Sequence, residues 1–223
     1  MFDFTYESVM SMLVYSEPDT MTLAEAIQQP YRHKFIKYME KELRYHIDRK
    51  HWKVITLLSI TSGKHAITML WLMKRKCDPL GKFFKWKARL FAGGHRSIEY
   101  VDYWYTYLPV VSWSTVQTMI VFAILNGWNM ESIDFVLIFP QAPIKTDIYM
   151  KPPKVTSGFS IPDLSAFFDK FLKVYKLLMN LYGLKDDGKT WFYFSKEGLL
   201  ERHWEKPEID SCLFTKKGIL LVV

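Results

Sequence analysis

The sequence is poor in the residues that build disulfide and metal frameworks. It has two cysteines in 223 residues, Cys77 and Cys212, and they lie far apart along the chain. Two such residues give no disulfide framework and no metal-ligand spacing, as is typical of proteins in a reducing compartment. Both cysteines are therefore expected to be small core residues. Two of the six histidines, His46 and His51, share no metal-binding spacing, so each histidine is expected to be a surface or structural residue.

Long apolar runs are also missing. The longest one, residues 119–125, is too short to cross a bilayer. The first seven residues are acidic and aromatic, whereas a signal peptide is basic and then apolar. These absences predict an intracellular protein, cytoplasmic or nuclear, with no membrane partner.

The chain is instead rich in apolar residues and in positive charge. Its hydrophobic content of 49% over 223 residues is enough for a sizeable core in one domain, with room for a small subdomain. The formal net charge is +7, and the excess is concentrated between residues 74 and 89. That segment interleaves cations with aromatic rings: Lys74, Arg75, Lys76, Lys82, Lys85, Lys87 and Arg89 with Phe83, Phe84 and Trp86. The pattern favours a nucleic-acid surface, and a solvated charged face is the alternative.

Periodicity and turn signals predict an α+β protein in which an open antiparallel sheet is backed by helices. Two helices are expected before residue 50. A basic β-hairpin is expected from strands 67–73 and 83–91, joined by the turn residues 78–81. A capping box from Ser114 to Gln117 and a left-handed cap at Gly127 predict a helix over 114–126. The remaining expected elements are strands 52–57, 130–139, 147–150 and 171–178, a loop over 153–168, a helix over 188–200, and a hairpin pairing 211–215 with 219–223.

Several separated blocks resemble the reverse transcriptase of copia-type LTR retrotransposons. They include Lys-Ala-Arg-Leu-Phe-Ala-Gly-Gly at 87–94, Leu-Pro-Val-Val at 108–111, Leu-Tyr-Gly-Leu-Lys at 181–185 and Asp-Ser-Cys-Leu-Phe at 210–214, in the family's order and spacing. The resemblance implies fingers and part of the palm of a right-hand polymerase over residues 51–223, preceded by a helical segment over 1–50. It implies RNA template, RNA–DNA duplex and deoxynucleotides as partners, and leaves the oligomeric state open.

Asp134 stands inside an otherwise apolar run, where a buried carboxylate is costly unless it is paired, hydrogen-bonded or bound to a metal. A solvent-facing Asp or one bonded to backbone N–H groups would also explain it. By resemblance, Asp134 is the family's first catalytic, metal-binding aspartate, with the backbone carbonyl of Phe135 as a further Mg²⁺ ligand. Phe139 falls on the aromatic beneath the nucleotide sugar, Arg89 on the residue that grips the triphosphate, and Lys82 is a weaker candidate for the same task.

The resemblance also shows what departs from the family. Its Tyr-x-Asp-Asp turn, which carries two of three catalytic carboxylates, does not occur in these 223 residues. Two Mg²⁺ ions roughly 4 Å apart cannot be fixed by one carboxylate, so we expect a truncated and inactive fragment. The apolar residues 219–223 are expected to form a buried strand whose open edge promotes self-association. The adjacent pair Asp186-Asp187 precedes Gly188 and predicts a turn or a helix N-cap, so it does not replace the missing carboxylates.

Two other functions are compatible with the sequence. Residues 183–190 match the phosphate-loop pattern G-x-x-x-x-G-K-[ST], but two carboxylates inside the loop would oppose a bound phosphate. The second alternative is a non-catalytic module that binds RNA or RNA–DNA duplex through the basic hairpin.

Overall fold

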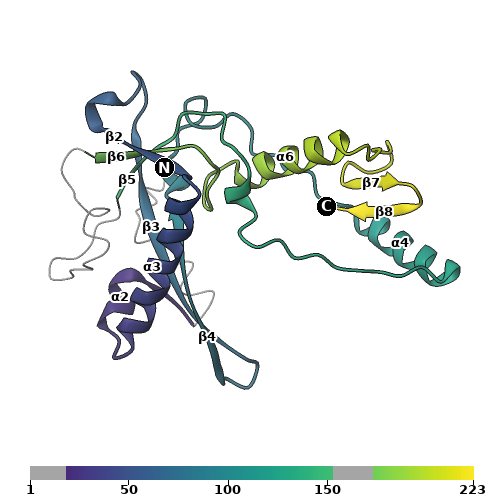
Figure 1. Cartoon of the computed structure of the whole chain (residues 1–223), viewed down its shortest axis with the longest axis horizontal. Helices are drawn as coiled ribbons and strands as arrows, with labels where there is room; N and C mark the ends of the chain where they lie inside the picture. Colours follow the sequence, from purple (N-terminus) through teal and green to yellow (C-terminus); the bar gives the residue numbers. More distant parts are fainter. Residues whose placement is uncertain (1–18, 153–172) are drawn as a thin grey trace, which may run out of the picture.

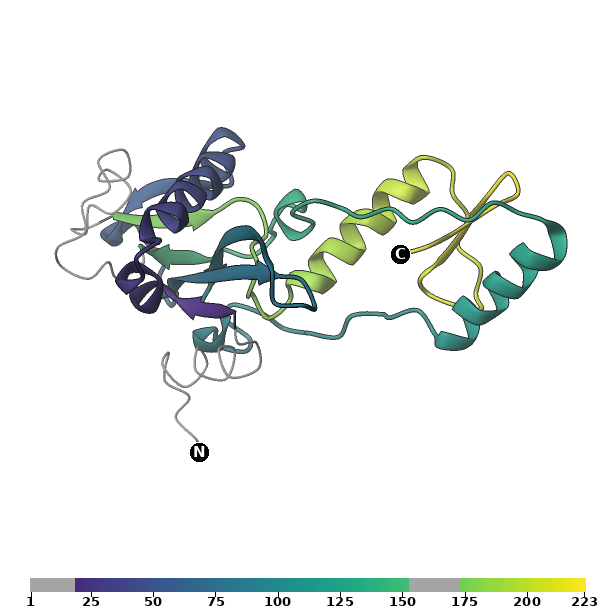
Figure 2. The same cartoon turned by 90° about the horizontal axis from the view of Figure 1, so that it is seen from below.

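The computed structural model of the chain describes residues 19–152 and 173–223. The loop expected over 153–168 and the first two residues of the strand expected over 171–178 therefore lie outside the described residues. The described part is an α+β protein with a mainly antiparallel sheet, as the sequence predicts. Figures 1 and 2 show a sheet lobe, formed by β1 to β6 with α2 and α3, and an arm formed by α4, α6, β7 and β8.

In the described residues 19–50 the chain forms two helices, which agrees with the prediction for this region. After the short strand β1 (Thr20–Thr22), α2 (Leu23–Gln28) begins at a capping box in which Thr22 and Glu25 satisfy each other's backbone N–H groups. Helix α3 (Arg32–Asp48) buries Phe35, Met39 and Leu43, which share one face because they are spaced four residues apart. This face packs against β4 and buries the apolar core of the sheet lobe.

The sheet contains six strands in the order β1-β3-β5-β6-β2, with β4 paired to β3. The remaining strands are β2 (Trp52–Thr56), β3 (Ala66–Cys77), β4 (Phe83–Ala92), β5 (Tyr149–Lys151) and β6 (Lys173–Leu177). All pairs are antiparallel except β3 with β5. Short 3-10 helices cover Leu57–Ser59, Gly94–Arg96 and Phe139–Gln141, the last of which is η3.

The β3–β4 hairpin forms as predicted. Its turn depends on Asp78, whose carboxylate accepts hydrogen bonds from the backbone N–H of Leu80 at 3.0 Å and of Lys82 at 2.8 Å. Gly81 follows with a φ of +79°, a left-handed conformation that glycine adopts without a steric cost. Local turn chemistry therefore fixes the basic hairpin.

The arm begins with α4 (Trp113–Asn126), which starts at a different cap from the one predicted. Ser112, rather than Ser114, is the N-cap: its hydroxyl accepts from the Thr115 N–H at 3.1 Å. The helix ends at Gly127, with a φ of 63°, as expected for a left-handed cap. The buried carboxylate of Asp210 holds this end of α4 in place, accepting from the Ser112 N–H at 3.0 Å and from the Thr115 hydroxyl at 2.6 Å.

The rest of the arm comprises α6 (Asp187–Glu201) and the hairpin of β7 (Leu213–Lys216) and β8 (Ile219–Val222). These elements match the helix and hairpin expected from the sequence. Strand β8 is not buried as predicted, because Ile219 is 58% exposed and the other three residues are half-buried. No helix within residues 19–152 and 173–223 is both long and apolar enough to span a membrane.

The strand predicted over 130–139 is wrong. In this fully described stretch the chain runs as an irregular connector from α4 to η3, with Met130, Ile133 and Val136 exposed. Its apolar, β-branched residues resemble a buried strand, but strand formation also needs a neighbouring strand to complete the hydrogen-bond ladder. Leu137 has a φ of 52°, which is outside the range of an extended strand, so a strand could not continue through it to η3.

Candidate nucleotide and nucleic-acid site

Strand β4 separates core residues from polar residues by simple alternation. Ala88, Leu90 and Ala92 are buried on the face toward the core, whereas Lys87 and Arg89 occupy the opposite face and are half-buried. The sheet lobe therefore fixes the backbone that carries Arg89 while leaving the arginine partly accessible.

Arg89, Tyr182 and Phe139 meet although they are far apart in the sequence. The guanidinium carbon of Arg89 lies 4.9 Å from the centre of the Tyr182 ring, within cation–π range. Phe139 approaches the same ring edge-on, with 4.9 Å between ring centroids. Within the part of the chain that the structure describes, the buried Nε of Arg89 has no hydrogen-bond partner. The cluster thus holds a guanidinium with unused donor capacity over the Tyr182 ring, which Phe139 in turn supports.

Tyr182 was not predicted as a site residue, although it belongs to the block at 181–185 that carries the resemblance. Burial raises the pKa of its hydroxyl, so Tyr182 is neutral at physiological pH. Its backbone carbonyl accepts from the Ala92 N–H at 2.8 Å, which ties the block at 181–185 directly to the end of β4. The sequence offered the motif as a signal but not this contact.

Glycines make the junction between these two blocks possible. Gly183 has a φ of +89°, and a Cβ placed on it would lie 2.5 Å from the Ala92 carbonyl oxygen. A Cβ on Gly94 would overlap the carbonyl oxygen of Gly183 itself. Both positions therefore require a residue without a side chain, because the two backbones are in direct contact.

Lys87 lies beside Arg89 on the accessible face of β4; the sequence placed it in the basic segment but gave it no site role. Burial, together with the nearby charges of Arg89, Lys76 and Lys85, lowers its pKa to about 8. The strand register places Lys87 opposite Lys74 and Lys85 opposite Lys76. Cross-strand partners share a face of the sheet, so four lysines line the hairpin face that leads to Arg89.

Lys82 is separated from this cluster. It lies in the turn at the tip of the hairpin, seven residues before Arg89, which corresponds to about 23 Å along an extended strand. The structure therefore does not bring Lys82 and Arg89 together as two ligands of one triphosphate. Lys87 and Arg89 are the cations placed side by side.

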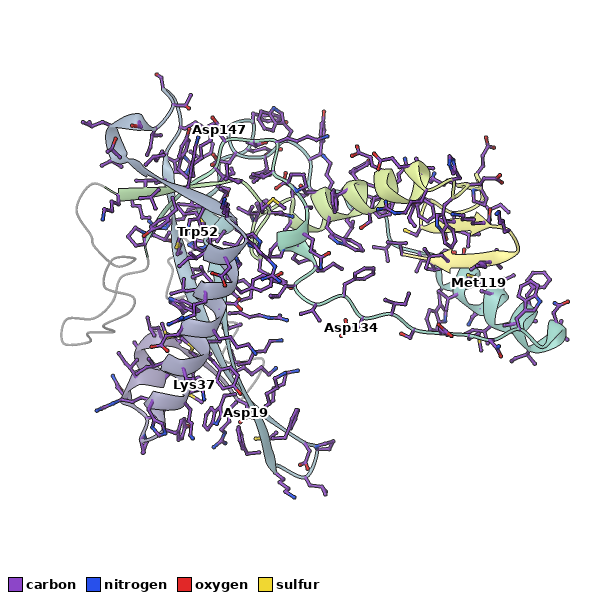
Figure 3. The ribbon with its side chains drawn as sticks, in the orientation of Figure 1. Asp19, Lys37, Trp52, Met119, Asp134 and Asp147 are labelled. Carbon is purple, nitrogen blue, oxygen red and sulfur yellow. The ribbon has the colours of Figure 1, made fainter. Side chains whose placement is uncertain are left out.

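Asp134 is exposed and lies on the connector between α4 and η3, in agreement with the solvent-facing alternative, although the strand expected around it does not form. Figure 3 places it on open chain, away from the labelled residues of the sheet lobe. The neighbouring Phe135 faces Trp191 of α6, with 5.8 Å between ring centroids. In the described ranges 19–152 and 173–223, no three His, Cys, Asp or Glu side chains gather as metal ligands. Asp134 and the Phe135 carbonyl therefore do not by themselves fit a two-Mg²⁺ centre.

The phosphate-loop interpretation of residues 183–190 conflicts with the structure. The carboxylate of Asp187 accepts from the Gly183 N–H at 3.1 Å and from the Gly188 N–H at 2.6 Å. These amides are ones that a phosphate loop would offer to its ligand, and a carboxylate of this chain already occupies them. Asp186 is the N-cap residue of α6, in agreement with the predicted turn or N-cap.

His46 and His51 are buried structural residues, one of the two roles expected from the sequence, and their contact with each other was not predicted. Their Nδ1 atoms are 2.8 Å apart, so one ring donates and the other accepts. Burial lowers the pKa of His51 to about 4, and the charges of His46 and Arg49 act in the same direction. His46 also stacks on Trp52 at 5.0 Å and lies 3.7 Å from Glu42. The pair is a structural element that joins the C-terminal end of α3 to the start of β2.

Comparison with known proteins gives a consistent result. A model of the family described as "Reverse transcriptase (RNA-dependent DNA polymerase)" matches residues 51–223. Residues of this chain are 24% identical over 212 positions to the Retrovirus-related Pol polyprotein from transposon TNT 1-94 of Nicotiana tabacum, covering 95% of this chain and 15% of that protein. The corresponding polyprotein from transposon RE1 of Arabidopsis thaliana is 26% identical over 209 residues, covering 94% of this chain and 13% of the relative.

Another relative is the Transposon Ty1-H Gag-Pol polyprotein of Saccharomyces cerevisiae, 26% identical over 207 residues, which covers 85% of this chain and 10% of that protein. The chain thus spans a small part of each curated relative, between 10% and 15% of its length. No solved structure matches.

Proposed function

Because this chain belongs to the reverse transcriptase (RNA-dependent DNA polymerase) family, we propose that it forms the part of a copia-type enzyme that holds the incoming deoxynucleotide and the template–primer duplex. The observation that carries the proposal is the Arg89–Tyr182–Phe139 cluster, in which a guanidinium with an unpaired Nε lies over the Tyr182 ring and Phe139 packs against that ring. A planar guanidinium is well suited to bind phosphate oxygens in a bidentate manner.

In this proposal Arg89 binds the triphosphate and Phe139 packs against the nucleotide sugar. Lys87 adds a second cation on the same face of β4, and the face continues with Lys74, Lys76 and Lys85 toward the hairpin tip. The four lysines form a path of positive charge along which the phosphates of an RNA template or an RNA–DNA duplex can be neutralised. An intracellular location is proposed with it, consistent with the free thiols of Cys77 and Cys212.

Asp134 would contribute one carboxylate to the catalytic centre of such an enzyme. Divalent metal ions supply transition-state charge stabilisation in this class of reaction, and one carboxylate does not hold two of them. We therefore propose that the 223-residue polypeptide binds nucleotide and nucleic acid without extending a primer. Extension that requires Asp134, seen with purified polypeptide and lost in Asp134→Asn, would refute this part of the proposal.

Nucleotide binding can be tested with a fluorescent deoxynucleoside triphosphate. Arg89→Ala should weaken binding by about tenfold or more, because a charge-assisted hydrogen bond contributes about 1.5–3 kcal/mol. Arg32→Ala is a matched control, since Arg32 is an exposed arginine on α3 and should leave the affinity unchanged. Equal affinity of Arg89→Ala and the parent chain would show that the cluster does not bind the triphosphate.

A non-catalytic nucleic-acid-binding module is the second candidate function. The lysine-lined face of the β3–β4 hairpin favours it, because this face could bind duplex without any nucleotide site. The nucleotide titration separates the two candidates. Duplex binding with no measurable triphosphate binding would support the non-catalytic function.

A further inference from the structure

The aromatic loop, residues 98–107, carries an unusual density of exposed rings. Tyr100 is 70% exposed, Trp104 45%, Tyr105 70% and Tyr107 76%. Single exposed aromatic residues are common on protein surfaces, but four within eight residues form a patch of the kind that marks an interaction site. We infer that this loop is a stacking surface for single-stranded nucleic acid, located outside the Arg89–Tyr182–Phe139 cluster.

The loop is held in shape by buried polar contacts. Asp102 is 4% exposed, and its carboxylate accepts from the Ile98 N–H at 2.9 Å. The same carboxylate lies 3.9 Å from the Lys64 ammonium and 3.5 Å from the His65 ring. A further backbone hydrogen bond of 2.8 Å, from the Tyr100 N–H to the Tyr103 carbonyl, closes the turn. The rings are therefore presented by an anchored loop, which lowers the entropy lost when a ligand binds.

Cations flank the exposed rings. The ammonium of Lys64 lies 5.9 Å from the centre of the Trp104 ring, and that of Lys189 lies 5.2 Å from the Tyr105 ring. Lys189 also donates a hydrogen bond of 3.4 Å to the Tyr105 carbonyl. Glu99 is the exposed carboxylate of the aromatic loop, whereas the carboxylate of Asp102 is buried and paired with Lys64. Rings with adjacent ammonium groups suit a ligand that alternates bases with phosphates.

The aromatic loop should bind single strands rather than duplexes, because stacking on its rings requires bases whose faces are free. Bases in a duplex already stack on each other, whereas unpaired bases offer their faces to aromatic side chains. Loop residue Tyr107 is followed by Leu108, which lies against the first turn of α6, because a Cβ on Gly188 would be 2.9 Å from a Leu108 methyl group. The aromatic loop thus adjoins the helix that follows Tyr182. The inference rests on the proposed function and assigns the unpaired part of the template to this loop.

The test compares binding of a short fluorescein-labelled oligo(U) with binding of a blunt RNA–DNA duplex. Trp104→Ala with Tyr105→Ala should weaken oligo(U) binding by about tenfold or more, while duplex affinity changes little. Two further variants guard against misfolding. Tyr105→Ala alone should lose part of the oligo(U) affinity, and the ring-retaining pair Trp104→Phe with Tyr105→Phe should bind oligo(U) almost normally. Tyr193→Ala is the matched control, because Tyr193 is 43% exposed on α6 with Lys196 at 5.9 Å from its ring.

Two results would overturn the inference. One is an oligo(U) affinity that is unchanged in the Trp104→Ala, Tyr105→Ala variant. If this variant also self-associates less than the parent chain, the exposed rings form a protein–protein interface instead. The other is an equal loss in Tyr193→Ala. Fluorescent triphosphate binding is measured on the same samples. If the Trp104→Ala, Tyr105→Ala variant keeps both its triphosphate affinity and its oligo(U) affinity, the inference about the aromatic loop is refuted and the proposed function is not. If Arg89→Ala leaves the triphosphate affinity unchanged, the proposed function is refuted.

Discussion

Gly94 and Gly183 lie backbone against backbone, so that a Cβ on Gly94 would overlap the carbonyl oxygen of Gly183. This contact joins the end of β4 to the turn that carries Tyr182, and so it sets the position of Tyr182 relative to Arg89. The separation of these two side chains depends on how closely the two segments approach.

Gly94→Ala should therefore destabilise the protein by about 1–3 kcal/mol, the usual cost of forcing extra volume into a packed site. Gly198→Ala is a suitable comparison. Gly198 lies inside α6, and its new Cβ would meet the flexible end of Arg202 at 3.3 Å. Helix propensity then predicts a gain of up to about 1 kcal/mol. Urea denaturation measures both, and a Gly94→Ala variant as stable as the parent would contradict the close contact.

Asp210→Asn should loosen the start of α4. The Asp210 carboxylate accepts hydrogen bonds from Ser112, Thr115 and Cys212, and these bonds lower its pKa to about 2. Hydrogen bonds to a charged group contribute on the order of 2 kcal/mol, so a loss of that size is expected at pH 7. Because the folded pKa is depressed, this stabilisation is present above about pH 4 and disappears as the pH falls toward 2.

The corresponding measurement compares unfolding free energies of Asp210→Asn and the parent chain at several pH values. The difference should shrink as the pH falls through that window. Glu208→Gln, a change at an exposed carboxylate nearby, should leave the stability unaltered at every pH. If the difference in unfolding free energy between Asp210→Asn and the parent chain were the same at every pH, the ionised carboxylate would be ruled out as the source of the stabilisation.

The buried His46–His51 pair should make the protein sensitive to mild acid. The pKa of His51 is about 4 in the folded state and near 6.5 when unfolded, so the unfolded chain binds the proton more readily. The contribution of neutral His51 to the free energy of unfolding is then fully present above about pH 6.5. It falls as the pH drops toward 4, by roughly 2 kcal/mol between pH 7.5 and pH 5. Tyr45, Trp52, Arg49 and Glu42 surround the pair, and Glu42 is the acidic group among them.

His51→Gln should flatten this pH dependence, as measured by chemical denaturation at pH 7.5 and pH 5. His33→Gln, at an exposed histidine of α3, should retain the full dependence of the parent chain. If His51→Gln were as sensitive to pH as the parent, another group would be responsible.

Duplex binding through the hairpin should depend steeply on salt, because each neutralised phosphate releases a counterion. Lys85→Ala with Lys87→Ala removes two cations from the face that leads to Arg89 and should lower the slope of log affinity against log salt by about 2. Lys34→Ala with Lys41→Ala, two exposed lysines of α3, provides the matched change in net charge. Fluorescence anisotropy of an RNA–DNA duplex gives both slopes; equal slopes would exclude the hairpin as the binding face.

The apolar surface of α4 should cause the 223-residue polypeptide to self-associate. Val121, Ile124 and Leu125 are 53%, 69% and 75% exposed, and within the described residues Ala123 is the buried side chain of this helix. Val121→Lys with Leu125→Lys should raise the monomer fraction in size-exclusion chromatography with light scattering. Ile209→Lys, at an isolated side chain that is 86% exposed, should not. A monomeric parent chain would contradict the prediction.

Features governed by neighbouring residues could be predicted from the sequence. The β3–β4 turn follows from the Asp78 carboxylate and Gly81, and the end of α4 follows from Gly127, because each is determined within a few residues. The basic character of the hairpin could be read in the same way. These interactions need no knowledge of the rest of the fold.

Features that depend on distant partners could not be predicted. Residues 130–139 have the composition of a buried strand, yet their conformation depends on a neighbour that no local pattern specifies. The contact of Tyr182 with Arg89 joins segments about ninety residues apart, and the depressed pKa of Lys87 arises first from its burial in the fold and then from nearby cations, including Lys76 on the neighbouring strand. His46 and His51 meet because the chain reverses direction between α3 and β2, which spacing along the sequence does not reveal.

The bond between Asp210 and the start of α4 also bears on the order in which the protein is made. Ser112 and Asp210 are 98 residues apart, so α4 leaves the ribosome well before its anchor is synthesised. At translation rates of about 5–20 residues per second, the interval is roughly 5–20 s. During this time the nascent chain carries an apolar helix with no attachment at its N-terminus, while β1, β3 and β4 can already pair. Chaperone binding to the growing polypeptide should therefore concentrate on residues 113–126.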